Sequence, residues 1–516
     1  MTALVRLLLF TGLAIVRLRA ESKPDFAGMW KVSDSRSSTV YVIEQNDGQL
    51  RIAMFIEDSL GARILDFKGP VDGQPHEQAL NGSAGSFRAA WEGDAIGFET
   101  WRDTSDGVRH IRRVMNLSAD GKTIAVQWTR ISPLPEESGT ETWQKQDPKP
   151  GDQNLFAARD LLEKVHGPSA EVNVAWGMLA TAFNDTVRAE RVLVPLIRKN
   201  KSSQTAKDAR QALIELYSRN SQVKKAVAQC DPDGCDLLRQ LRHYPELSVA
   251  HRGYARVQAT RKPDGKILLP VIAAGKKAKY QVDTGSSISL LQLSEASRLG
   301  LKLEPVTLSV GDIAGAHHDS YLAIVRTLSV GNMRLRNATF WVVPDAHLDV
   351  PGLLGIDILL KFETLRWNSS DVFEVGFAPA RRDMGKANLI FSDDVPLVEV
   401  SSNGKEDLSF VLDTGMTASY FFPSFAARFL DLMVARGRQA VFELTGEAGE
   451  SKLKELSLPD LQLRMGAMDL RIQSADVLLE RAPLWDERNY GLIGIDLLNL
   501  AHTVTIDFQA MRLTLE

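Results

Sequence analysis

Two short motifs each occur twice in this chain, in the same order. Residues 280–287 read Tyr-Gln-Val-Asp-Thr-Gly-Ser-Ser, and residues 410–417 read Phe-Val-Leu-Asp-Thr-Gly-Met-Thr. Each is followed by an apolar-Gly-x-Asp motif, Gly-Leu-Leu-Gly-Ile-Asp at 352–357 and Gly-Leu-Ile-Gly-Ile-Asp at 491–496. The Asp-to-Asp separations are 74 residues (357 − 283) and 83 residues (496 − 413). We therefore predict a duplicated folding unit in which each Asp-Thr-Gly follows an apolar strand.

These motifs resemble those of the aspartic proteases, and more closely those of the retropepsin-like branch. The resemblance covers roughly residues 254–516, about half of the chain. It implies a mainly-β fold with two lobes, at residues 251–387 and 388–516, in which each Asp-Thr-Gly loop supplies one carboxyl group. It also implies that the later Gly-x-Asp segment crosses beneath the loop. Because both lobes lie in one chain, a single copy can build the whole site.

The resemblance makes Asp283 and Asp413 the candidate catalytic residues. Two carboxyl groups about 3 Å apart cannot both ionise, so they share one proton, and one accepts a proton while the other donates. Glycine lets the backbone turn tightly beside each carboxyl group, and the resemblance assigns threonine to hydrogen bonds between the loops. The supporting residues are Thr284, Gly285, Ser286, Thr414 and Gly415.

The two loops differ after the glycine. Ser286 and Ser287 carry hydroxyl donors that can reach Asp283, whereas Met416 carries none beside Asp413. We therefore expect Asp283 to hold more of the negative charge and Asp413 more of the shared proton. Ordinary turn polarity is the alternative explanation of the two serines.

Strands and short helices are predicted in parallel around both motifs. The resemblance places a hairpin flap at residues 310–320 in lobe one and at 444–451 in lobe two. The flap candidates are Gly311, Gly315, Gly446 and Gly449, although glycines are equally typical of any hairpin. The predicted strands are 267–273, 278–283, 396–400 and 408–413, and the predicted helices are 294–299 and 423–430.

Three features depart from the family pattern. Neither flap has a clear aromatic tip, for which His317, His318 and Tyr321 are nearby substitutes. Residues 503–508 fit the closing strand of lobe two better than residues 362–367 fit that of lobe one, which suggests that lobe one has drifted. The resemblance also gives Asp357 and Asp496 a structural role, outside the proton-sharing pair.

Composition indicates a multidomain globular protein. The chain has 516 residues, of which 44% are hydrophobic and 24% charged, and its net charge is −4. This charge gives no reason to expect nucleic acid as a partner, so we expect a peptide or protein substrate. We expect no cofactor and no metal. A monomer is sufficient for the site, and an oligomer is not excluded.

Residues 1–20 have the pattern of an export signal. Arg6 precedes a ten-residue apolar run at 7–16, which is too short to span a bilayer, and Ala20 suits a cleavage site. Arg17 and Arg19 are irregular for such a signal. We expect a periplasmic or secreted protein with no membrane span after removal of the signal.

The chain contains two cysteines, Cys230 and Cys235, around the turn sequence Asp-Pro-Asp-Gly. Export favours a disulfide between them, with two free thiols as the alternative. A zinc site would need four suitable ligands, and no partner pair exists.

Two regions precede the protease-like half. Residues 22–146 show short alternating strands typical of an antiparallel barrel or sandwich, and Gly28-Met29-Trp30 resembles the opening of lipocalin-like barrels. Residues 151–250 show helical spacing, which predicts a helical region acting as a spacer or docking module.

The sequence therefore predicts an exported aspartic endopeptidase. Two alternatives remain open: a peptide-binding relic that has lost turnover, and a surface interaction protein whose N-terminal barrel binds a ligand.

Overall fold

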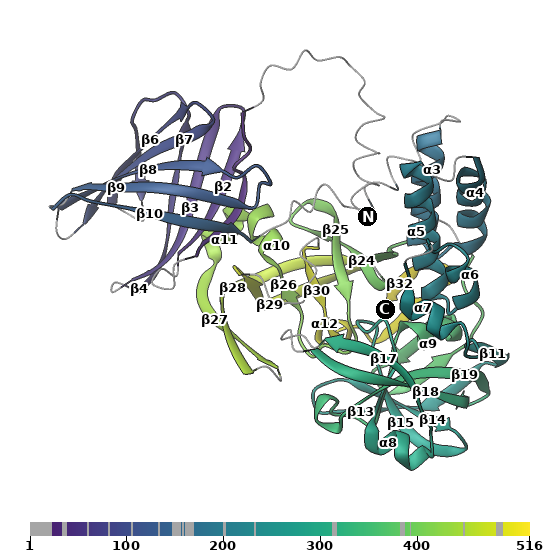
Figure 1. Ribbon diagram of the computed structural model, residues 1–516. Helices are drawn as coiled ribbons and strands as arrows, with labels where there is room; N and C mark the ends of the chain where they lie inside the picture. The colour runs from purple at the N-terminus through teal and green to yellow at the C-terminus, as the bar shows by residue number, and fades with distance from the viewer. Residues whose placement is uncertain are drawn as a thin grey trace.

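The computed structural model shows a β-rich chain with a group of helices between two β-rich parts (Figure 1). It describes residues 23–33, 39–58, 61–80, 83–104, 107–132, 135–146, 156, 159, 170–199, 203–231, 234–311, 317–381, 387–392, 394–446, 449–480 and 489–516. The predicted export signal at residues 1–20 lies outside these described residues.

The N-terminal part is a ten-stranded antiparallel sheet in the order β4-β3-β2-β1-β10-β9-β8-β7-β6-β5. Strands β4 and β6 are in contact, which closes the sheet into a barrel. Of the two architectures left open by the sequence, the structure therefore has the barrel. Its strands are β1 Gly28–Val32, β2 Val40–Asn46, β3 Gln49–Asp58, β4 Gly61–Pro70, β5 His76–Leu80, β6 Ser83–Glu92, β7 Ala95–Thr104, β8 Gly107–Leu117, β9 Thr123–Ser132 and β10 Glu137–Lys145.

Helices occupy the described residues between the barrel and the C-terminal half. Ser203 begins α5 by accepting a hydrogen bond from the N–H of Ala206 at 3.2 Å, which satisfies one free backbone donor. The predicted disulfide between Cys230 and Cys235 is confirmed, with the Cα atoms 6.1 Å apart. The helices are α3 Ala170–Ala182, α4 Thr186–Lys199, α5 Gln204–Arg219, α6 Val223–Val227 and α7 Asp236–Leu241.

The first repeat forms a nine-stranded sheet. Strand β14 shows its physical basis, because alternate residues from Ile267 to Ala273 are buried and those between them are not. The elements of this part of the chain are β11 Ser248–His251, β12 Ala255–Gln258, β13 Thr260–Arg261, β14 Ile267–Ala273, β15 Lys276–Val282, β16 Leu290–Gln292, α8 Leu293–Leu299, β17 Leu303–Gly311, β18 His317–Val330, β19 Met333–Val343, η2 Asp345–His347, β20 Gly352–Leu354, α9 Ile356–Phe362, β21 Thr364–Asn368 and β22 Val372–Val375.

The second repeat forms an eight-stranded sheet with the same pairing scheme. In the first sheet β14, β15, β20, β16 and β19 are successive neighbours, and in the second β24, β25, β30, β26 and β29 are. Its elements are β23 Leu389–Ser392, β24 Val395–Ser402, β25 Lys405–Leu412, β26 Tyr420–Phe421, α10 Pro423–Arg428, α11 Leu430–Arg436, β27 Arg438–Gly446, β28 Gly449–Met465, β29 Met468–Leu478, β30 Gly491–Ile493, α12 Ile495–Leu498, β31 Thr503–Asp507 and β32 Arg512–Leu515.

A third sheet, β12-β22-β21-β31-β32, joins the two repeats. Strands β21 and β31 run antiparallel, with Leu365 opposite Ile506 and Trp367 opposite Val504. Strand β21 lies in the segment of the first repeat that departs from the family pattern. It pairs with β31, the corresponding closing strand of the second repeat. Strand β21 forms although its sequence departs from the family pattern, because Thr364, Leu365 and Trp367 are buried.

The barrel and the helices both pack on the C-terminal half. In Figure 1 the barrel adjoins α10 and α11, and Arg51 on β3 contacts Asp431 on α11 at 2.6 Å. On the other side, Arg219 of α5 binds Asp394 at 3.0 Å, and Lys361 of α9 donates to the carbonyl of Asn220 at 2.6 Å. The helices therefore contact both repeats. No helix in the described part of the chain has the length and apolar character needed to cross a bilayer.

Candidate active site

The duplicated motifs lie side by side within each repeat. Strand β20 runs parallel to β15, and the N–H of Asp283 donates to the carbonyl of Leu354 at 3.1 Å. In the second repeat β30 runs parallel to β25, and the N–H of Asp413 donates to Ile493 at 3.0 Å. In each repeat, the strand of the apolar-Gly-x-Asp motif thus holds the backbone of the aspartate of the Asp-Thr-Gly loop in place.

Each Asp-Thr-Gly loop folds back on its own carboxyl group. Two consecutive backbone N–H groups donate to one oxygen of each carboxyl, which orients it and favours the charged form. The N···Oδ1 distances to Asp283 are 2.9 Å from Gly285 and 3.1 Å from Ser286, and those to Asp413 are 2.8 Å from Gly415 and 3.2 Å from Met416.

The two carboxyl groups face each other across the loops. A Cβ added to Gly285 would lie 2.2 Å from Oδ2 of Asp413, and one added to Gly415 would lie 2.2 Å from Oδ2 of Asp283. Each carboxyl group therefore occupies the space that a side chain would need on the opposite loop. The absence of a Cβ at both positions permits this approach.

Burial raises the pKa of both carboxyl groups. Burial, reinforced by the charge of Asp413, raises the pKa of Asp283 well above its usual range, and burial also raises the pKa of Asp413. Because the two carboxyl groups lie this close together, ionising both is unfavourable, and one of them would hold a proton while the other is charged. The pair can therefore present one acid and one base together.

Thr284 and Thr414 form a reciprocal set of hydrogen bonds between the loops. The N–H of each donates to the hydroxyl of the other, at 3.1 Å for Thr284 and 3.0 Å for Thr414. The Thr284 hydroxyl donates to the carbonyl of Leu412 at 2.7 Å, and the Thr414 hydroxyl donates to that of Val282 at 2.9 Å. Both threonines are buried, so these bonds hold the two loops in register without competition from water.

The serines after Gly285 do not play the part predicted from the sequence. The hydroxyl of Ser286 donates to the carbonyl of Ile288 at 2.7 Å, and only its backbone N–H reaches Asp283. Ser287 is exposed. The structure therefore does not support the serine hydroxyls as the cause of an unequal division of charge, because the backbone turn directs the Ser286 hydroxyl along its own loop.

A pair of serines supports the loops and was missed from the sequence. Ser289 and Ser419 both lie six positions after the aspartate of their loop, a regularity that the duplicated motif contains. Each hydroxyl links the loop to the downstream Gly-x-Asp segment. Ser289 donates to Asp357 at 2.6 Å and accepts from the N–H of Gly355 at 2.9 Å, and Ser419 donates to Asp496 at 2.6 Å and accepts from Gly494 at 2.8 Å.

Three of the four glycines named as flap candidates lie at the ends of hairpins. Gly311 ends β17 and pairs with His317, while Gly315 lies outside the described residues. Gly446 and Gly449 face each other at the end of the hairpin formed by β27 and β28. Across the described residues, no group of three or more His, Cys, Asp or Glu side chains is arranged to hold a metal ion.

Comparison with known proteins bears on the first repeat. Residues 269–358 match the family model described as aspartyl protease, and this range contains Asp283 and Asp357. No curated protein matches the chain. Among solved structures, a retropepsin-like aspartic protease from Rickettsia conorii is 22% identical, with 26% of this chain and 96% of that chain covered and a TM-score of 0.20. The family match supports a resemblance of the first repeat to the aspartyl proteases.

Proposed function

We propose that this protein is an aspartic endopeptidase whose catalytic pair is Asp283 and Asp413. The observation that carries the proposal is the reciprocal packing of each carboxyl group against the glycine of the opposite loop. The family match over residues 269–358 supports the reaction class. The Thr284 and Thr414 bonds support it further, because they hold the two loops at a defined separation.

In this reaction the ionised carboxyl group accepts a proton from water as the water oxygen attacks the scissile carbonyl carbon. The protonated carboxyl group donates to the carbonyl oxygen, which stabilises the developing charge. The C–N bond then breaks as a proton passes to the leaving amine, and one proton remains shared by the pair. No covalent intermediate forms and no metal or cofactor is needed.

We further propose that the substrate is a peptide or protein and that the enzyme is periplasmic or secreted. The disulfide between Cys230 and Cys235 supports an oxidising compartment. Residues 251–387 and 388–516 would act as two lobes that each contribute one carboxyl group, and hairpins β17–β18 and β27–β28 would close over the substrate.

The test is cleavage of a peptide library by the full chain from roughly pH 3 to 7, the range in which a shared-proton pair titrates. We expect cleavage that pepstatin inhibits and that Asp283→Asn and Asp413→Asn each lower on the order of 10⁴-fold. Cleavage at the unmodified rate in either variant would exclude the shared-proton mechanism. Peptide binding without turnover by the unmodified chain would favour a catalytically silent binding protein.

A further inference from the structure

The side chains inside the barrel are apolar along one part of the strands and charged farther along them. Side chains alternate between the two faces of a strand, and the inward positions form an apolar cluster around Trp30 and Trp143. On β7 this inward series continues from Ile96 and Phe98 through Thr100. The next position in the series is Arg102, so a charged residue follows the apolar core on the same face.

Strand β8 brings two more arginines to the same face. Met115 belongs to the interior cluster, and Arg113 and Arg109 lie two and six positions before it. In the register of the sheet Arg109 is directly opposite Arg102, and Arg113 is opposite Phe98. Two arginines thus lie opposite each other on β7 and β8, next to the apolar part of the interior series.

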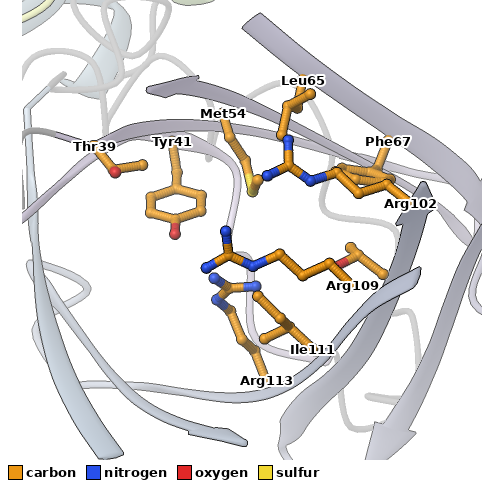
Figure 2. Close-up of a pocket in the computed structure, with 10 residues that line it drawn as sticks. Thr39, Tyr41, Met54, Leu65, Phe67, Arg102, Arg109, Ile111 and Arg113 are labelled. Atoms are coloured by element: carbon orange, nitrogen blue, oxygen red, sulfur yellow. The ribbon is translucent and has the colours of Figure 1, made fainter. Parts of the chain in front are cut away.

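These arginines line a cavity of about 210 Å³ (Figure 2). Figure 2 shows Arg102, Arg109 and Arg113 pointing inward, with Arg109 and Arg113 directed toward the Tyr41 hydroxyl. The described residues that line the cavity include no aspartate or glutamate, although Glu141 of β10 lies near enough for its charge to act on Tyr41. The lining residues are Thr39, Tyr41, Met54, Leu65, Phe67, Thr100, Arg102, Arg109, Ile111 and Arg113.

Arg113 is the strongest indication of a ligand. Its side chain is nine-tenths buried, with 9% of the residue exposed, and its guanidinium packs near the Tyr41 and Phe98 rings. Its Nε and Nη1 atoms have no hydrogen-bond partner among the described residues. A buried guanidinium with donors left over is costly, and a carboxylate that binds two of them is its best partner.

Apart from the arginines and Tyr41, the cavity is lined by Thr39, Thr100 and four apolar side chains. Met54 comes from β3, Leu65 and Phe67 come from β4, and Ile111 comes from β8. An ion such as phosphate would leave these side chains without a role. A ligand with a charged head and an apolar body would use both kinds of surface.

We propose that the N-terminal barrel binds a small amphipathic carboxylate, with its head on Arg113, Arg109 and Tyr41 and its apolar body against Met54, Leu65 and Phe67. Arg102 adds a third positive charge at the same end of the cavity. This site is distinct from the Asp283 and Asp413 pair and does not depend on the proposed peptidase activity.

The test uses the full chain and octanoate, with binding measured by calorimetry and by the ligand-induced rise in melting temperature. Octanol lacks the charge and acetate lacks the apolar body, so we expect octanoate to bind at least about tenfold more tightly than either. Arg113→Gln should weaken octanoate binding by at least about tenfold and remove the thermal shift. Arg112→Gln is the matched control, because Arg112 lies on the same strand and contacts Glu92 at the surface.

Three results would overturn the proposal. One is the absence of octanoate binding by the unmodified chain. Another is equal binding of octanoate and octanol, or of octanoate and acetate, which needs no variant and so does not depend on whether Arg113→Gln folds. The last is equal loss of binding in Arg112→Gln and in folded Arg113→Gln.

Discussion

The two Asp-Thr-Gly loops have the same geometry but different surroundings. Residues 282–290 and 412–420 share one pattern of burial, and both loops use the same backbone donors and the same threonine bonds. Behind the first loop, the partly buried Asp357 accepts a hydrogen bond from Ser289 and lies near Lys361, and both lower the pKa of its carboxyl group against the effect of burial. Behind the second, Asp496 lies near Asp476, which in turn raises the pKa of Glu455. The two loops thus share the geometry of the carboxyl pair and differ in the charges behind it.

The largest expected effect tests whether the two carboxyl groups act as one unit. Asp283→Asn and Asp413→Asn should each lower kcat on the order of 10⁴-fold, and the double variant should lower it no further, because either change removes the shared proton. Steady-state kinetics on a single peptide substrate checks this. Multiplicative losses in the double variant would show that the two groups act separately.

Next in size is the effect of adding a Cβ to either loop. Gly285→Ala would displace the carboxyl group of Asp413, and Gly415→Ala would displace that of Asp283. We expect each to lower kcat on the order of 100-fold, because a displacement of about 1 Å costs that much in a site of this kind. Gly234→Ala is the control, because its Cβ would lie 3.8 Å from the nearest atom. An effect confined to one of the two loops would contradict their equivalence.

The third prediction concerns stability. Thr284→Val leaves the carbonyl of Leu412 and the N–H of Thr414 without their partners, and Thr414→Val does the same for Val282 and Thr284. Each should lower the free energy of unfolding by roughly 2–4 kcal/mol. The corresponding serine variants keep the hydroxyl and should lose about 1 kcal/mol or less. Denaturant unfolding monitored by fluorescence distinguishes them, and equal losses for valine and serine would refute the role of the hydroxyls.

The smallest effect concerns the charges that distinguish the loops. Burial and the charge of Asp476 raise the pKa of Glu455 from 4.5 to about 7. Because folding raises this pKa, the folded state favours the protonated form, so the stabilising contribution is complete below pH 4.5 and is lost as the pH rises through about 7.

Glu455→Gln should therefore reduce the loss of stability between these pH values. Melting temperature against pH measures it, with the exposed Glu77→Gln as control. Asp357→Asn should likewise reduce the loss of stability as the pH rises to about 6, because burial raises the pKa of Asp357 to about 6. An unchanged pH profile in Glu455→Gln would show that Glu455 does not titrate in this range.

Local patterns anticipated much of the site and of the strands around it. Strand β14 has the bounds that the alternation of apolar residues predicts, and β25 ends one residue before Asp413. The prediction that the Ser286 hydroxyl donates to Asp283 failed for a different reason. Ser286 has the right residue type and position to reach Asp283, but the direction of its hydroxyl depends on the backbone path to Ile288.

By itself the sequence determined the repeated motifs and the two aspartates with their glycines and threonines, and it favoured a pairing of Cys230 with Cys235, because these depend on residue type and local spacing. Only the tertiary structure decided which carbonyl each threonine hydroxyl reaches, which charges lie behind each loop, and that three arginines share the barrel interior. Those partners lie far apart in the chain or on opposite faces of a strand. Their distances depend on sheet register and on packing between elements, which local residue patterns do not specify.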